Sequence, residues 1–280
     1  MRVRLPAARR PHARSCPATN TALTDPNRQG PHSGSPAANS SFGPYVPTAD
    51  WCPFHTYRSS TDIAPVYGSF LSNLETIPPL AAANLSTPGC FAYPDMLEVG
   101  NYNTQHLNVP PMNFSESRTH FGAFAIVSSP LVLGFDVTNA TTLDAVWPII
   151  ANAEVLAINS DYAGFSGSRF FASADVTAFT PCGWWAATCS FPTLQYWYKP
   201  MSNGDVAVLM MNNGVAPADL TLEFHDLPGF VMRQGSQAKV RDVFAHADLG
   251  TMDGAFSATV APRDSVFLRL TPVTSGAGDV

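Results

Sequence analysis

The spacing of apolar residues changes near residue 167, and this change constrains the fold more than any other feature of the sequence. Before it, apolar residues recur at intervals of three and four or form short continuous runs, as in helices that alternate with buried strands. After it, short stretches rich in β-branched and aromatic residues are separated by turn signals such as Asn203-Gly204. The sequence therefore predicts an α/β part followed by an all-β part.

The α/β part is expected to contain three helices and two buried strands. The helices are predicted at 64–77, ended by Pro78-Pro79, at 115–129, capped by Ser115, and from a capping box at 141–144 to Ile150. The strands are predicted at 131–137 and 154–159, where nearly every residue is apolar.

The all-β part is expected to be an antiparallel β-sandwich, because its short strands follow one another at close spacing. Its strands are predicted at 195–199, 205–211, 220–225, 239–244 and 265–270. We divide the chain into a disordered low-complexity segment at 1–38, the α/β part at 39–166, the sandwich at 167–273 and a tail at 274–280. The first segment is rich in Pro, Ser, Ala and Arg and has too little aliphatic bulk to build a core.

Composition and charge exclude several classes of function. The net charge is -6 and only 13% of residues are charged, which disfavours nucleic acid as a partner. The most apolar stretch, 121–135, is interrupted by Pro130 and is shorter than the ~20 residues of a membrane span. No pair of cysteines has the C-x-x-C spacing of a zinc or redox site, so we expect no metal site.

Three other features bear on the cellular compartment. The basic residues at the start are not followed by the apolar run of a signal peptide, so we expect none in this chain. However, Cys182 and Cys189 bracket a short loop that a disulfide could close. Four Asn-x-Ser/Thr sequons, at Asn39, Asn84, Asn113 and Asn139, could accept glycans.

Charged residues that could carry chemistry gather in two loops of the α/β part. Asp62 lies four residues after Arg58, and Asp95 lies in a second loop, both ahead of helix-like stretches. Ligands bind in such loops, because these follow the carboxyl ends of parallel strands. From spacing alone, the commoner outcome is that Arg58 and Asp62 form a surface ion pair and that Asp95 is a turn residue. A pocket role is likewise open for Asp136, although loop bonding or helix capping is the more usual role, and His120 is expected to be structural.

Several segments of the chain, in their order and spacing, resemble glycoside hydrolase family 27, the α-galactosidases or melibiases. They are 93–101, 118–121, 129–136 and 152–161, followed by 199–208, 240–250 and 256–260, so that the resemblance covers about 40–272. The resemblance implies a (β/α)8 TIM barrel followed by an antiparallel β-sandwich. Residues 39–166 would be the C-terminal half of that barrel.

The resemblance also implies a reaction and its residues. Family members remove terminal α-linked galactose with retention of configuration, using two carboxylates. The run from Tyr57 to Ile63 matches the family's acid/base pattern and makes Asp62 the acid/base candidate. By the same matching, Arg58 would bind sugar hydroxyls, and Asp95 with Met96 would line the galactose pocket.

One departure from the family concerns the nucleophile. The family nucleophile is an Asp in a Tyr-x-Lys-x-Asp strand, but the only lysines here are Lys199 and Lys239, both in the predicted sandwich. The sequence is therefore interpreted as N-terminally truncated relative to the family, without the nucleophile strand. Catalysis by the intact mechanism is then not expected of this chain.

The resemblance further implies the partners and the location. Expected substrates are α-galactoside oligosaccharides or glycoconjugates, with no cofactor, and the full-length form is a candidate homodimer that is secreted or lysosomal/vacuolar. Two alternatives stay open: an α-N-acetylgalactosaminidase, which differs in the pocket for the 2-substituent of the sugar, and a non-catalytic carbohydrate-binding remnant.

Overall fold

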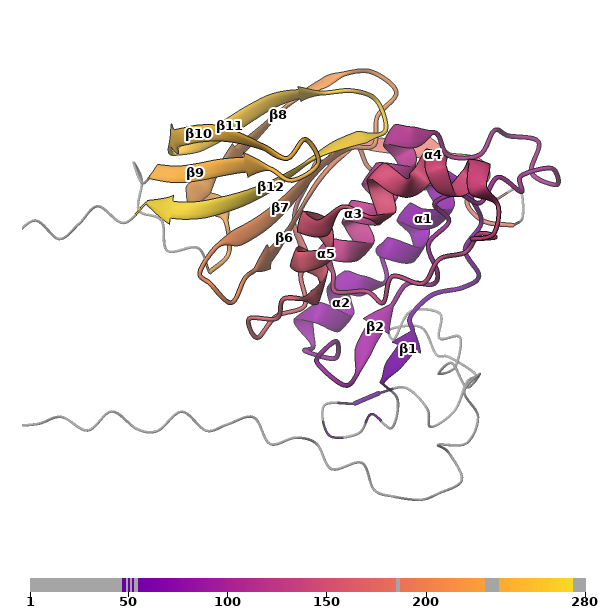
Figure 1. The fold of residues 1–280 in the computed structure, drawn as a ribbon, viewed down its shortest axis with the longest axis horizontal. Coiled ribbons are helices and arrows are strands. Elements are labelled where there is room, and N and C mark those ends of the chain that lie inside the picture. Colours follow the sequence, from indigo (N-terminus) through magenta and orange to yellow (C-terminus); the bar gives the residue numbers. More distant parts are fainter. Residues whose placement is uncertain are drawn as a thin grey trace, which may run out of the picture.

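The computed structural model describes residues 47–48, 50, 52, 55–184, 187–229 and 237–273. The predicted disordered segment 1–38 and the tail 274–280 lie outside these residues. In the described part, helices pack on one face of a large sheet, and two short parallel strands lie at the far edge of the helices (Figure 1).

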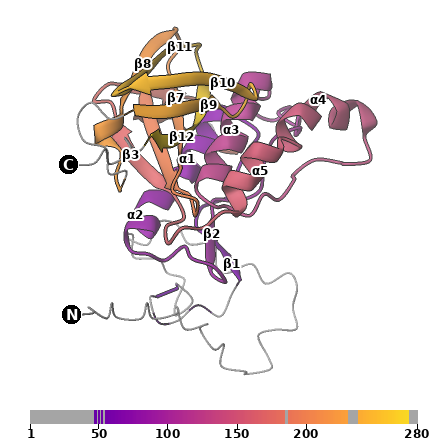
Figure 2. The same cartoon turned by 60° about the vertical axis from the view of Figure 1, so that its left-hand side comes forward.

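The α/β part begins with two parallel strands. β1 (Thr56–Arg58) and β2 (Phe91–Tyr93) are in register, with Tyr57 opposite Ala92. An isolated parallel bridge joins Leu97 to Leu133 further along the chain. The helices are α1 (Tyr67–Leu74), α2 (Ile77–Ala82), α3 (Phe114–Ile126), α4 (Ala140–Ile150) and α5 (Ala153–Ser160). Helices therefore follow short parallel segments, and α4 extends away from the sheets (Figure 2).

The predicted helices exist, but their ends differ from the prediction. The segment 64–77 is not one helix ended by Pro78-Pro79: these prolines lie in the first turn of α2, where a missing N–H costs no helical hydrogen bond. Ser115 is not the cap of α3. Asn113 caps it instead, in a box in which Glu116 N donates to the Asn113 side chain and Asn113 N donates to Glu116 Oε2.

The capping box predicted at 141–144 is also wrong. Asn139 caps α4, with its side-chain oxygen accepting from Thr142 N at 3.2 Å. An asparagine side-chain oxygen accepts from the first N–H groups of a helix as well as a hydroxyl does. Asn139 therefore caps α4 in place of the predicted box at 141–144.

Both strands predicted in the α/β part are wrong. Residues 154–159 belong to helix α5, because the Asn152 side chain accepts from Glu154 N and Val155 N, and the buried Val155 and Ile158 are three residues apart. Residues 131–137 form no strand beyond the bridge at Leu133, and that residue is exposed, so the segment is not buried.

The all-β part is a β-sandwich. A six-stranded antiparallel sheet has the order β10-β9-β12-β7-β6-β3, and the pair β11-β8 packs against it. The strands are β3 (Ser168–Ala172), β4 (Val176–Phe179), β5 (Cys189–Pro192), β6 (Leu194–Pro200), β7 (Val206–Asn212), β8 (Ala218–Glu223), β9 (Gln237–Asp242), β10 (Ala247–Asp253), β11 (Ala255–Val260) and β12 (Asp264–Val273). All five predicted strands are present, as β6, β7, β8, β9 and β12; a 3₁₀ turn at Phe224–Asp226 follows β8.

The large sheet is a middle layer with a core on each face. In β7, Leu209 packs with the helices, and its neighbour Met210 packs with β8 and β11. Every residue of β7 is buried, because both of its faces are covered. The core between the sheet and the helices also contains Phe121 and Phe124 of α3, so this helix joins the α/β part to the sandwich.

The chain passes from helices to sandwich at Gly167, where space is tightest. Gly167 has φ +98°, and a Cβ there would lie 2.0 Å from the carbonyl oxygen of Ile126. Only glycine fits at this position, since the conformation and the contact both exclude a side chain.

Two disulfides link segments of the described chain. The predicted bridge Cys182–Cys189 is confirmed, and a second bridge joins Cys52 to Cys90, 38 residues apart. In the part of the chain that the structure describes, no single helix is long and apolar enough to cross a membrane; α4 and α5 together meet the length and composition, with a 62° bend between them.

Candidate functional site

The sequence-predicted residues Arg58, Asp62 and Asp95 meet at the carboxyl ends of β1 and β2. Arg58 is the last residue of β1, and Asp95 lies two residues beyond β2. Arg58 donates from Nη2 to Asp62 Oδ1 at 2.6 Å and from Nη1 to Asp95 Oδ2 at 3.2 Å. One guanidinium therefore bridges two carboxylates from different loops.

The three side chains differ sharply in exposure. The Arg58 and Asp95 side chains are 7% and 5% exposed, whereas the Asp62 side chain is 65% exposed. A buried arginine is found where its charge is paired, and here both partners are anionic. This geometry leaves Asp62 as the carboxylate that a ligand in solvent can reach.

Backbone groups hold the Asp95 carboxylate in place. Oδ2 accepts from Ile63 N and Oδ1 from Met96 N, both at 2.9 Å. Asp95 itself has φ +101°, in the left-handed region that non-glycine residues rarely occupy. Such strain concentrates where a side chain must be aimed, as at binding sites.

Met96 lies beside this cluster but faces another segment. A Cβ placed on Gly134 would lie 3.1 Å from Met96 Sδ, so the thioether packs against the segment that follows the Leu133 bridge. Arg58, Asp62 and Asp95 are thus brought into direct contact, and Met96 forms the border between them and the 131–137 segment.

Glu98 is a buried acid whose importance the sequence interpretation missed. It is 3% exposed, and its Oε2 accepts from Asn101 Nδ2 at 2.5 Å. Burial raises the pKa of Glu98 to about 7, the charge of Asp95 adds to the rise, and the bond from Asn101 opposes it. The signal in the sequence was a glutamate between Leu97 and Val99, within an apolar run.

His120 and Asp136 have the structural roles expected of them. His120 is fully buried on α3, and its Nε2 accepts from Glu98 N at 3.0 Å; burial lowers its pKa to about 3, so the ring is neutral. Asp136 Oδ1 accepts from the backbone N and the hydroxyl of Thr138, and these bonds lower its pKa. Asp136 therefore stays ionised and shapes its loop.

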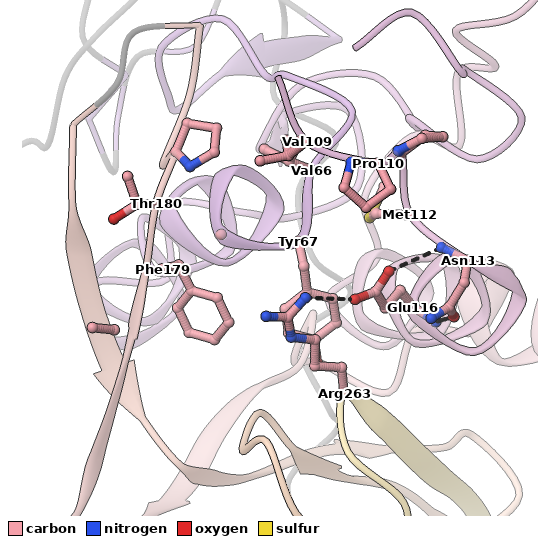
Figure 3. A pocket seen from close by; sticks show the side chains of 14 residues that line it. Val66, Tyr67, Val109, Pro110, Met112, Asn113, Glu116, Phe179, Thr180 and Arg263 are labelled. Carbon is pink, nitrogen blue, oxygen red and sulfur yellow. Dashed lines mark hydrogen bonds and ion pairs between the residues drawn. The ribbon is translucent and has the colours of Figure 1, made fainter. Parts of the chain in front are cut away.

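A separate groove lies between the helices and the sandwich (Figure 3). It has a volume of about 600 Å³, and none of the predicted site residues line it. Its cation, Arg263, lies over the rings of Tyr67 and Phe179 and donates to Glu116 Oε1 at 3.0 Å. Because Glu116 also closes the capping box of α3, the charged groups of this groove hold the helix to the sandwich.

The residues described in the structure contain no group of three or more His, Cys, Asp or Glu side chains that could hold a metal ion. The charged groups at the strand ends are two carboxylates and a guanidinium. These groups hydrogen-bond hydroxyls and transfer protons.

The chain is similar to known proteins in sequence and in fold. Residues 192–270 match the alpha galactosidase C-terminal beta sandwich domain. An α-galactosidase from Oryza sativa subsp. japonica is 31% identical over 219 residues, and one from Cyamopsis tetragonoloba is 29% identical over 185. The matches cover 78% and 66% of this chain but only 44% and 38% of those relatives, so the chain spans less than half of their length.

Solved structures share the fold. α-Galactosidase I from Mortierella vinacea superposes with a TM-score of 0.61 at 23% identity, covering 78% of this chain and 53% of that one. The Saccharomyces cerevisiae α-galactosidase, solved with raffinose, gives 0.59 at 19% identity, covering 78% and 60%.

The sequence matches to α-galactosidases, together with the matched β-sandwich, place the chain among the glycoside hydrolases. Within that class the relatives define it further. The chain belongs to the α-galactosidase family, glycoside hydrolase family 27.

Proposed function

We propose that the chain carries one half of the active site of a retaining α-galactosidase. In this proposal, residues 39–166 are the C-terminal half of a (β/α)8 barrel and 167–273 are its sandwich. The parallel pairing of β1 with β2, the parallel bridge from Leu97 to Leu133 and the helices that follow these segments support the barrel assignment.

The observation that carries the proposal is the Arg58 guanidinium held between Asp62 and Asp95. We assign Asp62 as the acid that protonates the leaving glycosidic oxygen and later activates water, because it is the exposed member. Arg58 and Asp95 bind hydroxyls of the galactose ring. Met96 supplies an apolar surface to one face of the sugar.

A retaining mechanism needs a second carboxylate about 5 to 5.5 Å from the acid. Asp95 is a poor nucleophile, because Arg58 and two backbone N–H groups engage both of its oxygens. We therefore assign the nucleophile to a Tyr-x-Lys-x-Asp strand outside these 280 residues, as no such pattern surrounds Lys199 or Lys239.

Sugar binding by the chain itself tests the proposal. Saturation-transfer NMR with methyl α-galactoside is expected to show contact with the wild-type chain and none with Arg58→Met. The matched control Arg118→Met removes an arginine whose partner, Asp264, lies outside the site, and should bind like wild type. Equal binding by Arg58→Met would contradict the site, and a preference for the N-acetylgalactosamine glycoside would change the substrate.

Hydrolysis of 4-nitrophenyl α-galactoside separates the enzyme from a carbohydrate-binding remnant. The chain alone is expected to give no turnover, because the covalent step lacks its nucleophile. Turnover that disappears in Asp62→Asn would instead show that this chain holds a nucleophile of its own.

We also propose that the full-length protein is secreted or vacuolar/lysosomal. The bridges Cys52–Cys90 and Cys182–Cys189 support an oxidising compartment, and the sequon residues Asn84 and Asn113 are exposed. Glycosidase treatment of the native protein, followed by mass spectrometry, tests this: unmodified sequons and free thiols would contradict it.

A further inference from the structure

A hollow lies beyond the parallel bridge that joins Leu97 to Leu133. Leu97 N donates to Val132 O at 2.7 Å, and Gly134 N donates to Leu97 O at 3.0 Å. The chain then continues from each strand-like segment through 100–105 and 134–142, and these two stretches line a hollow of about 410 Å³. We call it the Tyr102 hollow; its volume lies in the range of small-molecule sites.

The lining of the Tyr102 hollow combines aromatic and amide side chains with a single carboxylate. Tyr102, which is 48% exposed, and Phe135 provide the aromatic surface. The other polar residues of the lining are Asn101, Asn103, Gln105, Asp136, Asn139 and Thr142. Neutral amides and a carboxylate both bond hydroxyl groups, and no cation of this lining attracts an anion.

Several of these polar groups are available to a ligand. Asp136 uses Oδ1 for Thr138, which leaves Oδ2 without a partner among the described residues. Asn103 is exposed, and its backbone N–H donates to Asn101 Oδ1. Gln105 is exposed as well.

Other contacts keep the walls of the hollow in place. Asn101 is fixed by its bond to the buried Glu98. Gly100 has φ +83°, and a Cβ there would lie 3.0 Å from the Phe135 ring, so the two walls approach closely only because this residue is glycine. The polar groups are thus presented by a preformed surface, which lowers the entropy cost of binding.

The Tyr102 hollow adjoins the cluster formed by Arg58, Asp62 and Asp95. Gly134 lines the hollow and also contacts Met96, at the position where a Cβ would lie 3.1 Å from Sδ. Met96 directly follows Asp95, so the border between the cluster and the hollow is a single side chain.

We propose that the Tyr102 hollow is a subsite for the neutral sugar units attached to the terminal galactose. The inference rests on the proposed function, because it takes the galactose ring to lie at Arg58 and Asp95. In it, Tyr102 stacks on an apolar ring face, and Gln105, Asn103 and Asp136 bond hydroxyl groups. The hollow thus favours oligosaccharide over simple aryl or methyl galactosides.

Saturation-transfer NMR with raffinose tests the two assignments separately, because the signals of its galactose, glucose and fructose rings are distinct. The chain is produced in bacteria, so that no glycan on Asn139 enters the hollow. We expect saturation of the galactose ring and of at least one further ring. Tyr102→Ala should weaken raffinose binding roughly fivefold, as for the loss of one aromatic contact, and lower the saturation of the further rings relative to galactose, while binding of methyl α-galactoside stays unchanged.

Matched variants complete the test. Phe114→Ala removes another exposed aromatic ring, 50% exposed and outside the hollow, and should behave as wild type. Gln105→Ala is a second probe of the hollow, and Arg58→Met should lower the saturation of the galactose ring relative to the further rings. Thermal melting of each variant checks that it is folded.

Each outcome decides a different claim. Saturation confined to galactose, or further rings that are unaffected in both Tyr102→Ala and Gln105→Ala, would overturn the subsite and leave the proposed function standing. Saturation of the further rings without galactose would support the subsite and contradict the proposed function. Absence of all saturation would overturn both.

Discussion

At the scale of single residues, the site depends on charges that are buried in pairs. The spacing of Arg58 to Asp62 predicted an ion pair between them, but the contact of Arg58 with Asp95, 37 residues away, could not be predicted from spacing. Short-range spacing does not show which loops meet, and the resemblance to a family supplied that step. Glu98 was overlooked because its burial follows from tertiary packing around Asn101 and His120.

Asp62 carries the first prediction. In a full-length protein that restores the nucleophile strand, Asp62→Asn should lower kcat for an α-galactoside by about 10²- to 10⁴-fold, the contribution typical of a general acid. The melting temperature should change little, since the side chain is 65% exposed. Substantial residual activity would refute the assignment.

Glu98 gives a prediction for the pH dependence of stability. Its pKa is about 7 in the folded chain and near 4.5 when unfolded, so the folded state holds a proton that the unfolded state has released between these values. Stability should therefore fall as pH rises from about 4.5 to 7. Glu98→Gln should remove this fall. The difference in unfolding free energy between the variant and wild type should therefore rise in favour of the variant by at most about 3 kcal/mol from pH 4 to pH 8.

Urea unfolding at both pH values measures the effect of Glu98→Gln. The exposed Glu223 provides the control, because Glu223→Gln removes a carboxylate whose side chain is 47% exposed. Parallel pH profiles for wild type and Glu98→Gln would show that Glu98 is ionised in the fold.

At the scale of elements, local signals predicted the sandwich better than the α/β part. Strands such as β6 and β12 alternate between faces and are bounded by turns, which short windows of sequence reveal. The apolar run at 154–159 fits a strand or a buried helix equally well. Contacts with the sandwich decided for the helix: Lys199 Nζ donates to the carbonyls of Ile158 and Asn159 at the end of α5.

The other end of α5 provides a prediction. Glu154 accepts from Arg241 Nε and Nη2 at 2.6 and 2.7 Å, and these bonds, with His246, lower its pKa to about 2. Because the pKa of Glu154 is lower in the folded chain, its carboxylate stabilises the fold at pH values above the pKa of the unfolded chain. This stabilisation is lost as pH falls toward 2. Glu154→Gln should cost roughly 1–2 kcal/mol at pH 7 and progressively less below pH 4.5.

Chemical denaturation at pH 7 and pH 3 checks the Glu154 prediction. Asp248, the other partner of Arg241, is 81% exposed, so Asp248→Asn should cost less than about 0.5 kcal/mol at either pH. An equal cost for the two variants would show that Glu154 adds no more than a surface charge.

At the scale of the whole molecule, one sheet serves two cores. Leu209 and Met210 are adjacent in β7 yet belong to different cores, one shared with the helices and one inside the sandwich. Both are fully buried. The two parts of the chain should therefore unfold together, although the sequence divides them near residue 167.

The pair of substitutions Leu209→Ala and Met210→Ala tests this coupling. Each should destabilise the chain by about 2–5 kcal/mol and shift a single cooperative transition, followed both by far-ultraviolet circular dichroism and by tryptophan fluorescence. Two separate transitions, with Met210→Ala moving only one, would mean that the sandwich unfolds independently.

The tight passage at Gly167 has a consequence for how such proteins can be recombined. A Cβ at Gly167 would collide with the carbonyl of Ile126, at the end of α3, so the linker itself is shaped to the helix. A gene fusion that contained only the residues after Gly167 would expose to solvent the apolar sheet face that the helices normally cover. Domain exchange between glycosidases would give folded proteins more often if α3 and the sandwich were transferred together.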